Sequence, residues 1–389
     1  MAQTILALGA LYFFAHLLAT TFDKTRLPDV LVLMVIGIVG GPVLGWITPA
    51  SFGSAGVVLT TVALAVILFE SGTTLDLREI ARSARSALVV TLSTVFLTMI
   101  LVAVGARLAL GLTWLSSFLI GTIVCGTSSA VVIPIVKSLK LREGASTLLI
   151  LESALTDVAS IVFTFALLQA AQQGEVRVGF MIGQTISSTI FTTLAGAFVL
   201  YGAAELLGFA GAIAVMAFGI TLTNHQHFGL SRFISSRPLT GVTPTESDFY
   251  SEIVFLLKTF FFVYLGISMR VDDPAILAIA VALTVVAYLG RFLIAARFAP
   301  PGATRNEATV IAIMIPKGLA AAVLAGLPLE AGLVEGELIQ GIVYGIVLVS
   351  IVLTALLVAV RQFAPFAPIF DRMMLRYPLV AAAPTPERA

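Results

Sequence analysis

Long apolar runs alternate with short polar joints along almost the whole chain. A helix needs roughly 20 apolar residues to cross the hydrocarbon core of a bilayer, and most of the runs have about that length. The pattern predicts twelve membrane-spanning helices, near residues 4–21, 28–47, 53–71, 84–109, 115–138, 145–171, 178–201, 203–224, 247–268, 274–297, 307–327 and 338–361. Because few residues follow the last run, we expect a single all-α transmembrane domain over 1–389, without a soluble C-terminal domain.

The composition excludes several other classes of protein. Of the 389 residues, 59% are hydrophobic and 11% are charged, whereas soluble domains carry about a quarter of charged residues. A net charge of +1, without a basic cluster, gives no electrostatic footprint for nucleic acid. The single cysteine, Cys125, excludes an intrachain disulfide and a cysteine metal cluster. Motifs such as His-Glu-x-x-His and Gly-x-Ser-x-Gly are absent from the sequence, so we expect a transporter without a cofactor, not an enzyme.

Basic residues in alternate loops predict the orientation, because Lys and Arg in short loops remain on the cytoplasmic side. In the first half these residues are Lys24, Arg26, Arg78, Arg82, Arg85, Lys137, Lys140 and Arg142, and in the second half Arg232, Arg237, Arg297, Arg305, Arg361, Arg372 and Arg376. This distribution predicts a protein of the cell (inner) membrane whose N-terminus lies on the outer side and whose C-terminus lies in the cytoplasm. Such an arrangement needs an odd number of crossings, and the pattern gives twelve.

A short internal similarity predicts two structural repeats. Residues 11–18 (LYFFAHLL) and 200–207 (LYGAAELL) agree at five of eight positions, and each is followed by a Gly-Ile pair, at Gly37 and Gly219. We expect repeat one over about 4–171, repeat two over about 200–361, and a linking region over about 178–200. Inverted six-helix repeats need a thirteenth crossing between them. Residues 178–224 are too few for three helices, so either one helix is missing near 190–200 or one segment is strongly tilted or re-entrant.

The most informative polar group lies inside the sixth predicted span, where charges are costly and are usually paired or functional. The group reads Glu152-Ser153-Ala154-Leu155-Thr156-Asp157. Helical spacing places Ser153 and Asp157 on one face, and Glu152 with Thr156 on a neighbouring stripe. Their oxygens are ligands of the kind that hard cations take. The group therefore predicts a cation site, with helix-pinning salt bridges as the alternative.

Two spans contain interruptions that are typical of broken helices. Gly126-Thr127-Ser128-Ser129 lies within 115–138, and Pro316-Lys317-Gly318 lies within 307–327. Unwound backbone at membrane depth is tolerated where it lines a site or is buried in protein. Lys317, with Ser128 in the other interruption, is a candidate to compensate the dipole ends of the half-helices. The alternative is a proline kink with small-residue packing.

Together these residues resemble the monovalent cation:proton antiporter superfamily, in its sodium/proton exchanger (NhaP-type) branch. The pattern Glu152-Ser153-x-x-Thr156-Asp157 is similar to the E-S-x-x-N-D motif of that branch. The segments 69–72 (FESG), 290–291 (GR) and 316–320 (PKGLA) resemble further blocks of the family and come in its order. The resemblance covers nearly the whole chain.

The resemblance implies a homodimer of thirteen-helix protomers in the inverted-repeat antiporter fold, with two broken helices that cross beside the ion site. It implies that Asp157 binds the monovalent cation or the proton. The further oxygen ligands and neighbours that it implies are Ser153, Thr127, Glu70 and Thr156, and the core salt bridge joins Glu152 to Arg291. For Glu70, at the end of the third predicted span, a solvated helix end is the alternative.

The sequence departs from the family pattern in ways that leave the choice of ion open. Thr156 stands where the family usually has Asn, residues 127–129 (TSS) stand where it often has Thr-Asp-Pro, and Lys317 stands for an Arg. Proton and cation would compete for one carboxylate, which predicts electroneutral exchange of Na+ or Li+ for H+ by alternating access. A potassium/proton antiporter or a potassium-efflux transporter is the alternative, towards which residues 127–130 (TSSA) lean.

Overall fold

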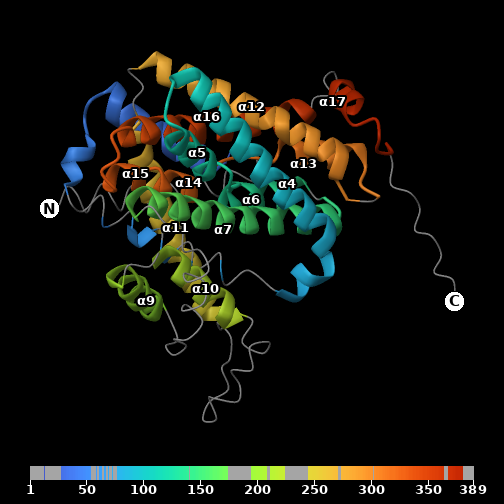
Figure 1. Ribbon diagram of the computed structural model, residues 1–389. Coiled ribbons are helices and arrows are strands. Elements are labelled where there is room, and N and C mark those ends of the chain that lie inside the picture. Colours follow the sequence, from blue (N-terminus) through green and yellow to red (C-terminus); the bar gives the residue numbers. More distant parts are fainter. Residues whose placement is uncertain are drawn as a thin grey trace, which may run out of the picture.

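The computed structural model describes residues 13, 28–53, 58, 61–63, 65–66, 69, 72, 77–139, 141–173, 194–207, 211–223, 244–269, 273–300, 302–362 and 367–379. Every regular element in these residues is helical (Figure 1). The first half contains α2 (Asp29–Ile38), which continues into a π-helical turn (Val39–Val43), a 3-10 turn (Pro49–Phe52), α4 (Leu77–Leu110), α5 (Trp114–Ile123), α6 (Ser129–Leu139) and α7 (Glu143–Gln173). The second half contains α9 (Leu194–Leu206), α10 (Gly211–Thr223), α11 (Pro244–Ile267), α12 (Pro274–Phe298), α13 (Arg305–Ile313), α14 (Leu319–Leu324), α15 (Leu327–Glu330), α16 (Gly336–Gln362) and α17 (Ala367–Met373).

Four helices among the described residues are long and apolar enough to cross a membrane. They are Leu88–Leu110, Gly144–Leu168, Pro274–Phe298 and Gly336–Arg361, which correspond to the predicted spans 84–109, 145–171, 274–297 and 338–361. The predicted spans 115–138 and 307–327 are each formed by two shorter helices with a break between them. The total of twelve crossings stays a prediction, because most of 4–21 and all of 174–193 lie outside the described residues.

One predicted boundary is wrong. The joint expected near residue 202, between spans 178–201 and 203–224, lies inside α9, which continues through Gly202 to Leu206. A glycine inside a helix costs only about 1 kcal/mol relative to alanine, and the neighbours Tyr201 and Ala203 are compatible with a helix. The next described helix, α10, begins at Gly211.

Small residues let the long helices approach closely. α12 packs against both α4 and α16, and α7 packs against α4, α5 and α6. A Cβ on Gly105 of α4 would lie 2.7 Å from a methyl group of Leu283, and a Cβ on Gly290 of α12 would lie 2.6 Å from one of Leu101. Helix pairs inside membranes associate largely through such van der Waals packing at small residues. The four long helices therefore form a tightly packed frame around the two broken helices.

Two further close crossings show the same pattern of contacts. A Cβ on Gly37 of α2 would lie 2.1 Å from the carbonyl oxygen of Val263 and 2.9 Å from the Cα of Gly266 in α11. A Cβ on Gly72 would lie 2.4 Å from the carbonyl oxygen of Met216 and 3.2 Å from the Cα of Gly219 in α10. In both cases a glycine faces another glycine and the carbonyl three residues before it.

Candidate functional site

The two interrupted segments meet each other at the centre of the structure. α5 ends at Ile123 and α6 begins at Ser129, while α13 ends at Ile313 and α14 begins at Leu319. The amide nitrogen of Ser128 donates a hydrogen bond to the carbonyl oxygen of Pro316 (2.8 Å). Two broken helices that cross at their breaks were predicted, and the fold confirms them.

The crossing is so close that only glycine fits at position 318. A Cβ on Gly318 would lie 2.0 Å from the Oγ and 2.3 Å from the Cβ of Ser128, although it would be 3.4 Å from the Cα of that serine. The conflict is therefore with the Ser128 side chain and not with its backbone.

We expect Gly318→Ala to destabilise the protein by about 1–3 kcal/mol, the usual cost of overpacking a tight contact, and to reduce transport. Ser128→Gly removes both atoms that the new methyl group would meet, so the double variant Gly318→Ala/Ser128→Gly is expected to regain most of the lost stability. Gly202→Ala in α9, where a Cβ meets nothing within 4 Å, is the matched control. Thermal unfolding of the purified wild type and the three variants measures the effect. A double variant as unstable as Gly318→Ala would contradict the proposed conflict with the Ser128 side chain.

Asp157 of α7 faces the first residue of α6. Its Oδ2 accepts a hydrogen bond from the Ser129 hydroxyl (3.1 Å). A negative charge is favourable at the N-terminus of a helix. Gly126 leaves room for this carboxylate, because a Cβ there would lie 3.1 Å from its Oδ1. Asp157 is partly exposed. Residues 127–129 lack the aspartate that the family often has there, so Asp157 is the carboxylate that faces the start of α6.

Three hydroxyl residues predicted as ligands or neighbours lie beside Asp157, and their hydrogen bonds differ. Thr156 accepts from the backbone amide of Thr127 (3.0 Å) and donates to the carbonyl of Ser153 (3.1 Å). The Ser153 hydroxyl donates to the carbonyl of Ile150 in its own helix (2.9 Å). The Thr127 hydroxyl is buried and has no hydrogen-bond partner among the described residues. Glu70 lies outside the described residues.

Lys317 is fully buried at the crossing. Its ammonium donates to the carbonyl oxygen of Gly126 (3.0 Å), beyond the C-terminal end of α5, and its backbone amide donates to the Ser350 hydroxyl (2.8 Å). A cation is favourable beside the carbonyl end of a helix. Ser128 contributes its backbone amide to the same crossing, and charge compensation by these two residues stays a prediction.

A buried ion pair joins the long helices around the site. The Arg291 guanidinium of α12 donates through both terminal nitrogens to the two carboxylate oxygens of Glu152 in α7. Its Nε donates to the carbonyl of Ile311 in α13 (2.9 Å), and the Thr94 hydroxyl of α4 donates to Glu152 (2.9 Å). Four helices are thus held at one point, where both charges are compensated by short, charge-assisted hydrogen bonds.

Sequence reasoning missed several polar residues of this network. Thr94 and Ser350 are single hydroxyls inside apolar helices, where no motif distinguishes them. The Tyr288 hydroxyl donates to the carbonyl of Ser350 (3.0 Å), and this links α12 to the helix that contacts Lys317. Ser129, which bonds to Asp157, belongs to the interruption at residues 126–129. Its position at the start of a half-helix is the feature that could have identified it.

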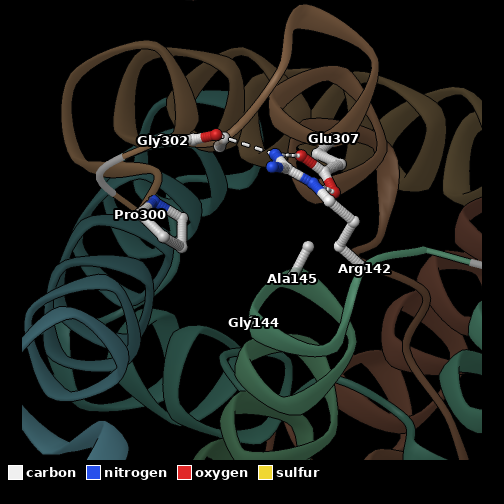
Figure 2. A pocket seen from close by; sticks show the side chains of 7 residues that line it. Arg142, Gly144, Ala145, Pro300, Gly302 and Glu307 are labelled. Carbon is white, nitrogen blue, oxygen red and sulfur yellow. Dashed lines mark hydrogen bonds and ion pairs between the residues drawn. The ribbon is translucent and has the colours of Figure 1, made fainter. Parts of the chain in front are cut away.

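A pocket lies at another place, between the first turn of α7 and the loop before α13. Figure 2 shows Arg142, the residue just before α7, reaching towards Glu307, with Pro300 and Gly302 across the opening. Arg142 forms an ion pair with Glu307 and donates to the carbonyl of Gly302 (2.7 Å). Glu307 also accepts from the backbone of Thr304 (2.9 Å). This pocket contains none of the residues around Asp157, and its ion pair ties α7 to α13.

A family model described as "Sodium/hydrogen exchanger, transmembrane" matches residues 9–196 and 180–359. The chain belongs to the sodium/hydrogen exchanger family. The resemblance found in its motifs is thereby confirmed, and the exchanger is a multi-pass membrane protein from a family of transporters.

Solved structures with the same fold include the sodium proton antiporter MjNhaP1 from Methanocaldococcus jannaschii at pH 8. It has a TM-score of 0.71 and 21% identity, with 91% of this exchanger and 99% of that chain covered. An electron-microscopy structure of the same antiporter has a TM-score of 0.66 and 20% identity, covering 97% and 98% of the two chains. These matches confirm the predicted antiporter fold.

A relative by sequence is the Na(+)/H(+)-K(+) antiporter GerN of Bacillus cereus. It is 23% identical to the exchanger over 362 residues, which cover 84% of this chain and 88% of the relative.

Proposed function

We propose that this exchanger moves Na+ or Li+ in one direction and H+ in the other, one for one, by alternating access. The observation that carries the proposal is the position of Asp157. It is a partly exposed carboxylate at the meeting point of two broken helices. A charged carboxylate at membrane depth is costly unless a partner compensates it. A monovalent cation and a proton can each do so, and they compete because the site carries one charge.

The one-for-one ratio follows from the other charges near the crossing. Glu152 is held by Arg291, and Lys317 lies against the carbonyl of Gly126. Among the described residues at the crossing, this leaves Asp157 as the acid whose charge can be exchanged. Each half-cycle would then carry one positive charge, as cation or as proton, and the exchange would be electroneutral.

The proposed ligand set contains Asp157, Ser153, Thr127 and Glu70, with Thr156 beside them. Thr127 is supported by its buried hydroxyl, which has no partner among the described residues and can give its oxygen to a cation. Thr156 holds the unwound backbone through the Thr127 amide. A cation at Asp157 would compete with the hydrogen bond from the Ser129 hydroxyl.

We also propose the two inverted repeats, over about 4–171 and 200–361 with a linking region over about 178–200. The supporting observation is the equivalence of the two glycine crossings. Gly37 and Gly219 hold the same place in the two repeats, and each crosses a helix of the other repeat with the same contacts. An assembly as a homodimer in the inner membrane, with the N-terminus outside, belongs to the same proposal.

Exchange in proteoliposomes tests the proposed function. Vesicles that enclose a pH-sensitive dye are given Na+, Li+ or K+ at several pH values, and we expect dequenching with Na+ and Li+. The name of GerN, a Na(+)/H(+)-K(+) antiporter, favours K+ as a second candidate, and dequenching by K+ equal to that by Na+ would establish it. An imposed membrane potential should leave the rate unchanged. A rate that rises with the potential would overturn electroneutrality, and no exchange with any of the three ions would overturn antiport.

A further inference from the structure

A C-terminal strap, residues 367–379, folds back over the ends of two helices. It consists of α17 and the turn that follows it. The Tyr377 hydroxyl donates to the carbonyl of Ala295 in the last turn of α12 (3.0 Å). The carbonyl oxygens of Tyr377 and Pro378 accept from the Nε (2.8 Å) and the backbone amide (2.9 Å) of Arg305, the first residue of α13.

These contacts fix the depth of the strap. α12 and α16 are two of the helices long enough to cross the membrane, and the strap is attached at the end of each. The attachment to α16 is an ion pair between Arg361, in the last turn of that helix, and Asp371 (3.2 Å). Figure 1 shows α17 beside this end of the bundle. The strap therefore lies where two spanning helices leave the hydrocarbon core, at the level of the lipid headgroups.

The strap has a buried apolar side and an exposed one. Phe370, Met374 and Tyr377 are buried against the helix ends. Met373, Leu375 and Leu379 are exposed by 48%, 65% and 64%. Exposed apolar residues interspersed with basic ones are typical of segments that lie in the interface of a membrane.

The charges at this end are unbalanced. Of six arginines here, Arg142 and Arg361 have carboxylate partners, Glu307 and Asp371. The other four have no carboxylate partner among the described residues, and they are Arg297, Arg305, Arg372 and Arg376. Arg372 and Arg376 lie on the strap itself and are exposed, next to the exposed apolar residues.

We propose that the strap binds the headgroup of an anionic phospholipid. Arg372 and Arg376 would contact the lipid phosphate, and Met373, Leu375 and Leu379 would lie among the upper parts of the acyl chains. Clustered basic residues at the end of spanning helices attract anionic lipids in this way. Because the strap holds Arg305, a bound headgroup would also stabilise the half-helix α13, which leads into the second break.

Lipid-dependent thermal unfolding of the full chain in neutral detergent tests the proposal. Cys125 is buried, so its reaction with a thiol-reactive dye reports unfolding. Phosphatidylglycerol is expected to raise the Tm more than phosphatidylcholine does, because a ligand of the native state stabilises it. Arg372→Gln/Arg376→Gln should lose this difference, with an affinity for phosphatidylglycerol that is roughly 5- to 30-fold lower.

Three matched variants make the result specific. Arg372→Lys/Arg376→Lys keeps the charge and should keep most of the shift. Arg107→Gln removes a charge outside the strap, in the last turn of α4 beside Leu112, and should keep the whole Tm shift. Arg376 donates to the carbonyl of Arg297 (3.0 Å), so Arg372→Gln alone serves if the double variant does not fold.

The outcomes that overturn the proposal are defined in the same assay. A glutamine variant that retains the full shift with phosphatidylglycerol would exclude the strap as the binding surface. Equal shifts with phosphatidylcholine would exclude charge recognition, and an equal shift with inorganic phosphate would exclude a lipid as the ligand. None of these measurements depends on transport, so the proposal can fail while antiport stands.

Discussion

Asp157→Asn is expected to abolish cation-driven proton movement and to leave the protein folded. Asparagine has nearly the shape of aspartate, and its side-chain oxygen can still accept the hydrogen bond from Ser129. It can neither bind a proton at physiological pH nor offer a full negative charge to a cation. Both half-cycles of the proposed exchange therefore fail together. In proteoliposomes, dequenching with Na+ or Li+ should fall to the level of vesicles without protein.

The control for this variant is Asp273→Asn. Asp273 caps α12 and accepts hydrogen bonds from the backbone amides of Ala275 (3.0 Å) and Ile276 (3.3 Å). Asparagine is about as good an N-cap as aspartate, so the same chemical change should here leave transport and Tm unchanged. If Asp157→Asn transported Na+ at the rate of this control, the assignment of the exchanged charge to Asp157 would be wrong.

The broken helices could be predicted because their causes are local in the sequence. Pro316 lacks the amide that a continuous helix needs, and Gly318, two positions later, is a poor helix former. Small and polar residues from Gly126 to Ser129 mark the other break inside an apolar span. Unwound backbone at membrane depth must be satisfied by other protein groups, and the bond from Ser128 to the Pro316 carbonyl is one such contact. That the two breaks cross was implied by the family resemblance, and the fold confirms it.

Partners that come from distant parts of the chain could not be predicted from spacing. Arg291 and Glu152 are 139 positions apart, and their pairing was implied by the family resemblance alone. Thr94 and Ser350 carry no local signal, because a single hydroxyl in an apolar helix can bond to its own backbone. Which of them reaches the site depends on the rotation of each helix, and packing determines that rotation.

The boundary error near residue 202 has a different, local origin. A division of the apolar stretch at its glycine placed a joint at Gly202, where α9 continues to Leu206. A single glycine is tolerated inside a helix at a cost of about 1 kcal/mol, so it is a weak marker of a helix end. Gly37 and Gly219, which the internal similarity pairs, both lie at close crossings, and the two repeats stay a proposal.

Glu152→Leu is expected to lower the free energy of unfolding by about 3–5 kcal/mol, the usual cost of leaving a buried charge without its partner. Both side chains of the Glu152–Arg291 pair are almost completely buried, so solvent cannot replace the lost carboxylate. The Tm, followed through dye labelling of Cys125, should fall clearly, and expression in the membrane should fall with it. A variant as stable as the wild type would show that Arg291 finds another counter-charge.

The double variant Glu152→Leu/Arg291→Met separates the structural role of the pair from a role in ion binding. Replacing both members of a buried pair by apolar residues is often neutral or stabilising, so most of the loss should be recovered. The Ile311 carbonyl would still lack the guanidinium, and an unsatisfied buried polar group costs about 1–3 kcal/mol, whereas the Thr94 hydroxyl keeps its bond to the carbonyl of Val90 (2.7 Å). The double variant should therefore lie between the single variant and the wild type. If the pair only holds α7, α12 and α13 together, this partly restored protein still exchanges Na+ for H+ through Asp157. A stable double variant without exchange would instead place Glu152 or Arg291 in the transport step itself.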